Sequence, residues 1–201
     1  NLKTQRVSEL LNKMGVNHHS YMFYPANLWP HKNHKMLLVA FGMFIFKNPK
    51  CKVDLVLTGT LEVQQDLKNY ISKMRLSERV HFLGFVTDEQ LSAVWTGCKF
   101  LVFPSLYEGF GIPIVEAMAF GKPIICSNVT SLPEIARDTA IYFNPNIPDD
   151  IEKCMEKVAF DDKLRYEMVA CGKRRISLFD SDAMAAEYLK YFDAVLNCVD
   201  H

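Results

Sequence analysis

Short hydrophobic runs alternate along this chain with longer segments in which hydrophobic residues recur at helical spacing. The runs have the length of buried strands, and they lie at residues 20–24, 53–58, 80–83, 100–103, 124–127 and 141–143. The segments predict helices at residues 2–14, 32–46, 62–74, 88–96, 112–120, 132–137, 149–160, 161–177 and 181–197. Strands that alternate with helices predict a parallel sheet covered on both faces. We therefore expect an α/β fold of the doubly wound, Rossmann-like kind.

Loops of interest follow strands of this predicted sheet, at residues 25–31, 59–60 and 105–111. The carboxyl ends of parallel strands meet at one edge, and doubly wound folds bind their ligands beyond that edge. We therefore expect these loops to converge on one site. The sequence contains no internal repeat and no linker that would divide it, so residues 1–201 are expected to form a single domain.

The balance of charge narrows the classes of partner. Lys and Arg together number 23, as do Asp and Glu, which argues against nucleic acid as a partner. No hydrophobic run reaches the length that spans a bilayer, so we expect a cytoplasmic protein with at most peripheral contact at the inner face of the membrane. The six cysteines are scattered without a C-x-x-C pair, which indicates free thiols in a reducing compartment. Because the chain begins at Asn1 rather than at methionine, we expect it to be a piece of a longer protein.

Residues 103–124, FPSLYEGFGIPIVEAMAFGKPI, carry the strongest chemical signal. Gly109 and Gly111 allow a close approach of the main chain to a ligand, and Pro113 suits the first turn of the following helix. The free N–H groups of such a helix start attract phosphate. Glu108 and Glu116, the latter expected in the first helical turn, are suited to accept hydrogen bonds from hydroxyl groups.

Parts of this segment have ordinary explanations. A Gly-x-Gly before a helix is usually a tight turn, and acidic residues near a helix start are often dipole partners. The complete string, however, resembles the Glu-x7-Glu signature of retaining nucleotide-sugar glycosyltransferases of family 4, which have the two-domain GT-B fold. The flanking residues in register are Pro104-Ser105, Gly109-Phe110-Gly111, Pro113, Glu116-Ala117 and Gly121-Lys122-Pro123.

The resemblance implies a role for each part of the signature. Glu116 would bind the ribose hydroxyls, and Glu108 would contact the transferred sugar. The amides of residues 109–112 would hold the sugar and the distal phosphate; these residues are Gly109, Phe110, Gly111 and Ile112. Retaining transfer in this fold would proceed on one face of the sugar, with the leaving phosphate taking the proton of the acceptor, so the chemistry relies on orientation and electrostatics.

Residues 24–34, YPANLWPHKNH, resemble the first phosphate loop of the same family. On that match Lys32 faces the donor diphosphate, although by itself it reads as an exposed lysine at a helix start. The family often has an arginine five or six positions earlier, where this chain has Asn27 and Ala26. A second cation would then come from elsewhere, for example from His31 or His34.

Two further segments match places where the family brings its main chain close to the nucleotide. Thr58 and Gly59 follow the second predicted strand, and the backbone of Phe85 and Val86, after the third, would read the base. As isolated residues these are ordinary strand ends. The resemblance therefore adds Asn27, Thr58, Gly59, Phe85 and Val86 to the candidate binding residues.

Other motifs carry less weight. Asp180-Ser181-Asp182 is a D-x-D triplet of the kind that binds a divalent metal in a different glycosyltransferase fold, but between helices it reads as a helix cap. The histidine pair at 31 and 34 has no carboxylate or thiol nearby. No G-x-G-x-x-G follows the first strand, which disfavours NAD. We expect no metal and no cofactor, the nucleotide diphosphate sugar being a substrate.

The resemblance covers only the C-terminal half of a GT-B enzyme. The expected parent transfers a hexose, with mannose the mild preference, to a glycan, lipid or other acceptor, as in the synthesis of cell-envelope polysaccharide. Its acceptor site would lie on an N-terminal domain absent from this chain, so the piece alone would turn over little. The alternatives are a GT-B relative such as a sugar-nucleotide epimerase or a phosphorylase, and a nucleotide-sugar-binding module without catalysis.

Overall fold

The computed structural model describes residues 4–17, 20–59, 64–180 and 185–192. Within these residues the strands form a six-stranded parallel sheet in the order β3-β2-β1-β4-β5-β6. The strands are β1 (Tyr21–Pro25), β2 (Asp54–Thr58), β3 (Val80–Phe82), β4 (Phe100–Phe103), β5 (Ile124–Ser127) and β6 (Ala140–Phe143). The predicted doubly wound, Rossmann-like architecture is confirmed.

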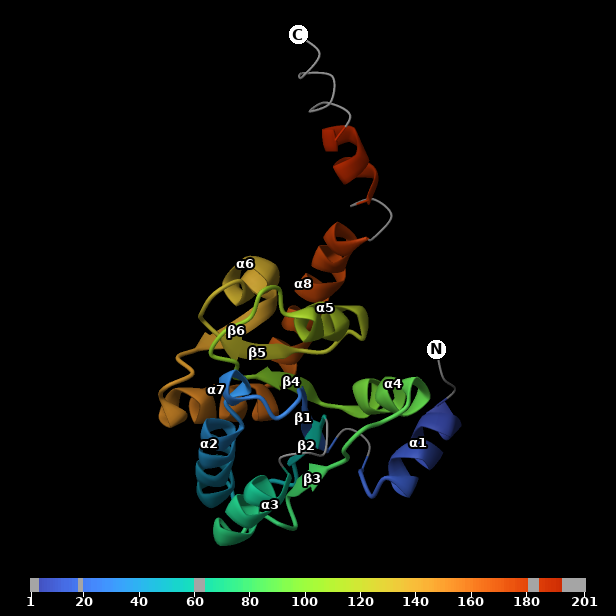
Figure 1. Cartoon of the computed structure of the whole chain (residues 1–201). Helices are drawn as coiled ribbons and strands as arrows, with labels where there is room; N and C mark the ends of the chain where they lie inside the picture. Colours follow the sequence, from blue (N-terminus) through green and yellow to red (C-terminus); the bar gives the residue numbers. More distant parts are fainter. Residues whose placement is uncertain (1–3, 18–19, 60–63, 181–184, 193–201) are drawn as a thin grey trace.

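Helices cover both faces of the sheet (Figure 1). The α-helices are α1 (Thr4–Lys13), α2 (His34–Lys47), α3 (Gln64–Lys73), α4 (Asp88–Gly97), α5 (Ile112–Ala119), α6 (Leu132–Ala136), α7 (Pro148–Phe160) and α8 (Asp162–Arg175), and short 3-10 turns are η1 (Pro30–Lys32), η2 (Arg137–Thr139) and η3 (Ile176–Phe179). In Figure 1, α2, α3 and α7 lie on the left of the sheet and α1, α4 and α5 on the right, with α8 packed against α5.

Hydrophobic patterning explains the centre of the sheet. Residues 21–24 of β1 and 100–103 of β4 are fully buried, as expected for strands covered on both faces. Phe23 packs edge-on against Trp95 of α4, and the Tyr21 hydroxyl donates to the Val94 carbonyl over 2.7 Å. The start of α4 is fixed by a capping box in which Thr87 and Gln90 exchange hydrogen bonds.

The strand order creates a switch point between β1 and β4. These strands are neighbours, yet the chain leaves β1 toward α2 on one face and leaves β4 toward α5 on the other (Figure 1). Doubly wound folds bind their ligands at such a switch point, beyond the carboxyl ends of the strands. The predicted loops at residues 25–31 and 105–111 belong to this pair of strands.

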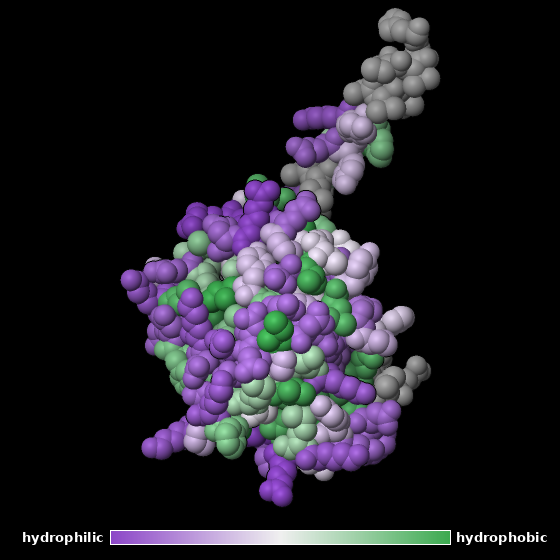
Figure 2. All heavy atoms as spheres, turned by 90° about the vertical axis from the view of Figure 1, so that its left-hand side faces the viewer, coloured by the Kyte–Doolittle hydropathy of each residue, from purple (hydrophilic) through white to green (hydrophobic). Residues whose placement is uncertain are grey.

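The last predicted helix, at residues 181–197, falls partly outside the described residues. Residues 185–192 are helical, and the surface view shows this segment projecting beyond the body of the domain (Figure 2). Its large hydrophobic side chains, Tyr188, Leu189, Tyr191 and Phe192, are exposed. On the face shown in Figure 2, hydrophobic side chains of the body lie in small groups between hydrophilic ones.

Candidate functional site

The loop between β1 and α2 holds Lys32 through its main chain. The buried Tyr24 hydroxyl donates to the Lys32 carbonyl over 2.7 Å, and the Leu106 N–H donates to the His31 carbonyl over 2.7 Å. Asn33 takes a left-handed conformation with a φ of 60°, and its Nδ2 donates to the carbonyls of Pro104 and Pro145 over 3.1 and 2.9 Å. The loop after β1 is thereby fastened to the loop after β4.

Lys32 and Glu108 meet across the switch point. The Lys32 Nζ lies 2.5 Å from Glu108 Oε1, and the two side chains are only 19% and 12% exposed. The same ammonium lies 5.7 Å from the centre of the Phe103 ring. The structure therefore brings together the lysine expected to face the donor diphosphate and the glutamate expected to contact the transferred sugar, which are the two candidate catalytic residues, as an ion pair poorly screened by water.

The turn that follows Glu108 presents unused hydrogen-bond donors. The main-chain N–H groups of Gly109, Phe110, Gly111 and Ile112 make no hydrogen bond to any described part of the chain. Gly111 has a φ of 95°, and a Cβ there would lie 2.7 Å from Leu132 Cδ2, so this position requires glycine. With α5 beginning at Ile112, these donors lie at the start of a helix, where an anion is favoured.

The side chain of Phe110 does not belong to that group of donors. Its ring packs edge-on against Phe179 of η3, with the ring centres 6.0 Å apart. The ring thus rests on η3, while the main-chain N–H of Phe110 has no acceptor in the described chain, as the sequence analysis expected of a donor in this turn.

Glu116 differs from the prediction in its position along the helix. The sequence analysis expected Glu116 in the first helical turn. Because α5 begins at Ile112, Glu116 instead lies beyond that turn. Its half-buried carboxylate has no hydrogen bond or ion pair with the described residues, and burial raises its pKa. An acceptor without a partner is suited to hydroxyl groups of a ligand.

The remaining predicted residues line one hollow at the carboxyl ends of β1, β2 and β3. Its volume is about 360 Å³, and its lining residues are Pro25, Ala26, Asn27, Thr58, Gly59, Gly84, Phe85, Val86 and Leu91. Gly59, with a φ of 142°, is required there because a Cβ would lie 2.4 Å from the Ala26 carbonyl oxygen. The Phe85 side chain is 80% exposed. The five other predicted binding residues therefore line the same hollow; they are Asn27, Thr58, Gly59, Phe85 and Val86.

His34 does not supply the second cation that the sequence analysis considered. His34 is buried beside Tyr24, and burial, with a smaller contribution from the Lys32 ammonium, lowers its pKa to about 4. His34 is therefore neutral near pH 7. His31 lies half-buried in η1.

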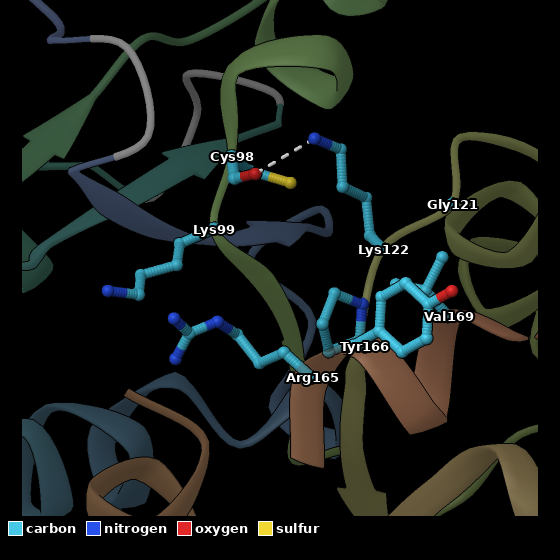
Figure 3. A pocket seen from close by; sticks show the side chains of 8 residues that line it. Cys98, Lys99, Gly121, Lys122, Arg165, Tyr166 and Val169 are labelled. Atoms are coloured by element: carbon cyan, nitrogen blue, oxygen red, sulfur yellow. Dashed lines mark hydrogen bonds between the residues drawn. The ribbon is translucent and has the colours of Figure 1, made fainter. Parts of the chain in front are cut away.

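A second hollow of about 360 Å³ lies at the opposite edge of the sheet, before β4 and β5 (Figure 3). Lys122 points to the Cys98 carbonyl in Figure 3, and its Nζ donates to the carbonyls of Thr96 and Cys98 over 2.7 and 3.0 Å. Arg165 donates to the carbonyls of Val158 and Ala159 and pairs with Asp162. Two of its cations are thus occupied by helix ends.

Two findings concern the metal and membrane predictions. In the described parts of the chain, no group of three or more His, Cys, Asp and Glu side chains is placed to hold a metal ion. The D-x-D triplet extends into 181–184, outside the described residues. No helix in the ranges that the structure describes is long and apolar enough to cross a membrane.

Sequence reasoning missed the residues that hold the loops. These are Tyr24 and Asn33 on the Lys32 side, and Thr130 and Ser131 on the Glu108 side. Asparagine tolerates the left-handed conformation, so the residue type of Asn33 gave a weak indication of a turn before a helix. Ser131 heads the string Ser-Leu-Pro-Glu, which indicates a helix cap rather than a contact with a distant loop.

The chain matches one protein family and is similar to several known proteins. The family model described as "Glycosyl transferases group 1" matches residues 11–175. The O-antigen chain mannosyltransferase B of Escherichia coli is 33% identical over 171 residues, 85% of this chain and 45% of its own. The O-antigen chain mannosyltransferase RfbU of Salmonella typhimurium is 27% identical over 195 residues, 92% of this chain and 52% of its own. The chain thus spans about half the length of these relatives.

Solved structures share the fold. A glycosyltransferase from Rickettsia africae superposes with a TM-score of 0.86 at 16% identity, covering 98% of this chain and 53% of the other. Anabaena HepE, in complex with UDP and glucose, superposes with a TM-score of 0.73 at 24% identity, covering 94% of this chain and 53% of the other. These likenesses confirm the α/β fold and place it in about half of each neighbour.

Proposed function

Because this chain belongs to the glycosyl transferases group 1 family, we propose that it is the donor-binding domain of an enzyme that uses a nucleotide diphosphate sugar. The observation that carries the proposal is the turn at residues 109–112, whose N–H groups have no acceptor in the described chain, beside the Lys32–Glu108 pair. An ammonium and a group of free amides suit a diphosphate, because both donate to anionic oxygens.

The donor extends along the carboxyl edge of the sheet in this proposal. Its nucleoside occupies the hollow lined by Asn27, Thr58, Gly59, Phe85 and Val86. Glu116, which has no partner in the described chain, accepts hydrogen bonds from the ribose hydroxyls. The diphosphate lies against Lys32 and the amides of 109–112, and the sugar reaches Glu108.

The chemistry follows from these positions. Lys32 turns from Glu108 to the diphosphate and stabilises the negative charge that develops as the bond from the sugar to the phosphate breaks. Glu108, released from the pair, accepts a hydrogen bond from a sugar hydroxyl group and thereby orients the sugar ring. The acceptor hydroxyl forms the new bond on the same face of the sugar, and its proton passes to the leaving phosphate oxygen. We propose retention of configuration, as in family 4, with no step assigned to a metal or an organic cofactor.

The names of the relatives guide the finer assignment. Two of them are O-antigen chain mannosyltransferases, so we propose a hexose, with mannose first, and a glycan or lipid acceptor in cell-envelope polysaccharide synthesis. Since the chain spans about half of these relatives, we propose that residues 1–201 form one domain and that a separate N-terminal domain binds the acceptor. The chain alone would then bind donor weakly and turn over little. The proposed location is the cytoplasm or the inner face of the membrane.

One observation favours a second function, that of a nucleotide-sugar-binding module without catalysis. Asn27 stands where the family often has arginine, and His34 is neutral, so neither supports Lys32 as a second cation. Such a module would bind the donor but would not transfer its sugar when joined to the N-terminal half. A sugar-nucleotide epimerase would instead alter the sugar without an acceptor.

Calorimetric titration of the folded chain with UDP-, GDP- and ADP-sugars tests the donor site. We expect one nucleotide series to bind. A folded sample that binds none of them would falsify the donor-site proposal. Glu116→Ala should weaken nucleotide binding more than binding of the free sugar, whereas the exposed Glu167→Ala should change neither. Equal losses of nucleotide and sugar would argue against the ribose role of Glu116.

A further inference from the structure

The hydroxyl of Ser131 contacts the donor turn instead of capping its own helix. Ser131 occupies the N-cap position of α6, yet it makes no side-chain cap hydrogen bond. Its Oγ instead lies 3.0 Å from the Glu108 carbonyl oxygen and 3.3 Å from the Phe110 carbonyl oxygen, and these two acceptors share its one hydroxyl hydrogen. A serine at this position ordinarily accepts from a helix N–H group. The local hydrogen bond is therefore replaced by contacts with a loop more than 20 residues away.

Those contacts fix the orientation of two peptide groups in the turn. In a planar trans peptide, the C=O and the following N–H point in opposite directions, and the described chain has no cis peptide bond. The carbonyl of Glu108 shares its peptide with the N–H of Gly109, and the carbonyl of Phe110 shares its peptide with the N–H of Gly111. With both carbonyls turned to Ser131, these N–H groups point away from it, and neither finds an acceptor in the described residues.

Thr130 holds the preceding peptide of the same turn. Its Oγ1 accepts from the Glu108 N–H over 3.2 Å. Thr130 has a φ of 53°, which is unusual for a β-branched residue. Such conformations persist where the surroundings enforce them and are concentrated at functional sites. The residues before α6 thus hold Glu108 through its N–H and its C=O, while the amides from 109 onward stay unused.

We propose that Ser131 is a positioning residue, which binds the carbonyls of Glu108 and Phe110 so that the Gly109 and Gly111 amides face the phosphates and sugar of the donor. The inference rests on the proposed donor site and deepens it. Ser131 does not touch the donor itself. Its hydroxyl sets the direction of two donors that the diphosphate uses, and the nucleoside hollow at the ends of β1, β2 and β3 does not depend on it.

The test compares a nucleoside diphosphate with its nucleoside. Ser131→Ala removes the hydroxyl, and the probe is whichever of UDP, GDP or ADP binds the unaltered chain best, titrated beside uridine, guanosine or adenosine. We expect about a tenfold loss of diphosphate affinity, the effect of one hydrogen bond, with the nucleoside affinity unchanged. Ser131→Thr keeps a hydroxyl and should restore diphosphate affinity to within about twofold.

A matched control is Ser20→Ala at the opposite edge of the sheet. Ser20 Oγ also donates to a carbonyl, that of Asn17, over 2.8 Å, and its loss should leave both affinities unchanged. If Ser131→Ala does not fold, Ser131→Gly serves in its place, because glycine is itself acceptable at an N-cap.

The possible results separate the two proposals. If the unaltered chain binds none of the nucleotides, the donor site is wrong and the role of Ser131 fails with it. If the unaltered chain binds, but the hydroxyl-free variant keeps its diphosphate affinity, the positioning role alone is overturned. Equal losses for nucleoside and diphosphate also overturn it, because they indicate a general structural defect.

Discussion

The Lys32 ammonium and the Glu108 carboxylate lie 2.5 Å apart although 76 residues separate them in the chain. Each belongs to the loop that leaves one of two neighbouring strands, β1 and β4. An anionic ligand must compete with Glu108 for the ammonium of Lys32. Ligand binding and the freedom of the Glu108 carboxylate are therefore linked through this pair.

Replacing Lys32 with methionine should weaken nucleoside diphosphate binding by about 10- to 100-fold, because the charge-assisted contact to phosphate is lost. The change should also lower the free energy of unfolding by about 1–3 kcal/mol, since Glu108 is left largely out of water without its partner. Calorimetry and urea unfolding measure the two effects. The exposed Lys35→Met is the control, and the double variant Lys32→Met, Glu108→Gln should regain stability without regaining affinity. Recovery of affinity in that double variant would contradict the phosphate role of Lys32.

Glu116 should make stability depend on pH. Burial raises the pKa of this carboxyl in the folded chain, so the folded state holds the proton more tightly than the unfolded state. The contribution of Glu116 to stability is therefore fully present below the unfolded value of about 4.3 and is lost as the pH rises through the raised folded pKa. Across that window, urea unfolding should show the unaltered chain losing stability relative to Glu116→Gln. A constant difference between the two proteins would show that the folded pKa is not raised.

Gly59 and Gly109 should respond differently to alanine. Gly59→Ala forces a methyl group against the Ala26 carbonyl at a φ of 142°, and we expect a loss of about 1–3 kcal/mol in the free energy of unfolding. Gly109→Ala, where a Cβ would meet nothing within 4 Å, should change stability by less than about 0.5 kcal/mol. Thermal unfolding of the two variants gives the comparison, and equal losses would mean that the close approach at Gly59 is absent in solution.

Asn33 should distinguish its conformational role from its hydrogen bonds. Asn33→Gly keeps the left-handed turn but removes the contacts with the carbonyls of Pro104 and Pro145, and we expect a loss of about 1–2 kcal/mol. Asn33→Ala loses the same contacts and adds the strain of a positive φ, so it should be less stable by about 1 kcal/mol more. Chemical unfolding of both variants measures these differences. An alanine variant as stable as the glycine variant would argue against the left-handed turn.

Hydrophobic periodicity predicted the fold well because the strands are short, buried runs. The strands at 100–103 and 124–127 have the predicted bounds, and that at 20–24 is displaced by one residue. The helix expected from residue 32 begins at His34, because the left-handed Asn33 separates it from η1. Periodicity reports burial, and it carries no information about such a local change of backbone conformation.

The sequence predicted only part of the candidate site. The sequence marks Lys32 and Glu108 as residues that follow strands, but their contact depends on β1 and β4 being neighbours, which is a property of the strand order. The role of Ser131 was hidden for another reason. Its local string is that of a capping box, and only the folded chain shows that the hydroxyl reaches a different loop.

The uncapped start of α6 has a consequence for protein engineering. This helix has five residues and begins without a side-chain cap, so it is an obvious target for raising the melting temperature. Any redesign that recruits the Ser131 hydroxyl to the helix would withdraw it from the neighbouring turn. A higher melting temperature and tight binding of the nucleotide therefore make opposite demands on Ser131. A screen for heat resistance alone would select variants that bind the nucleotide weakly.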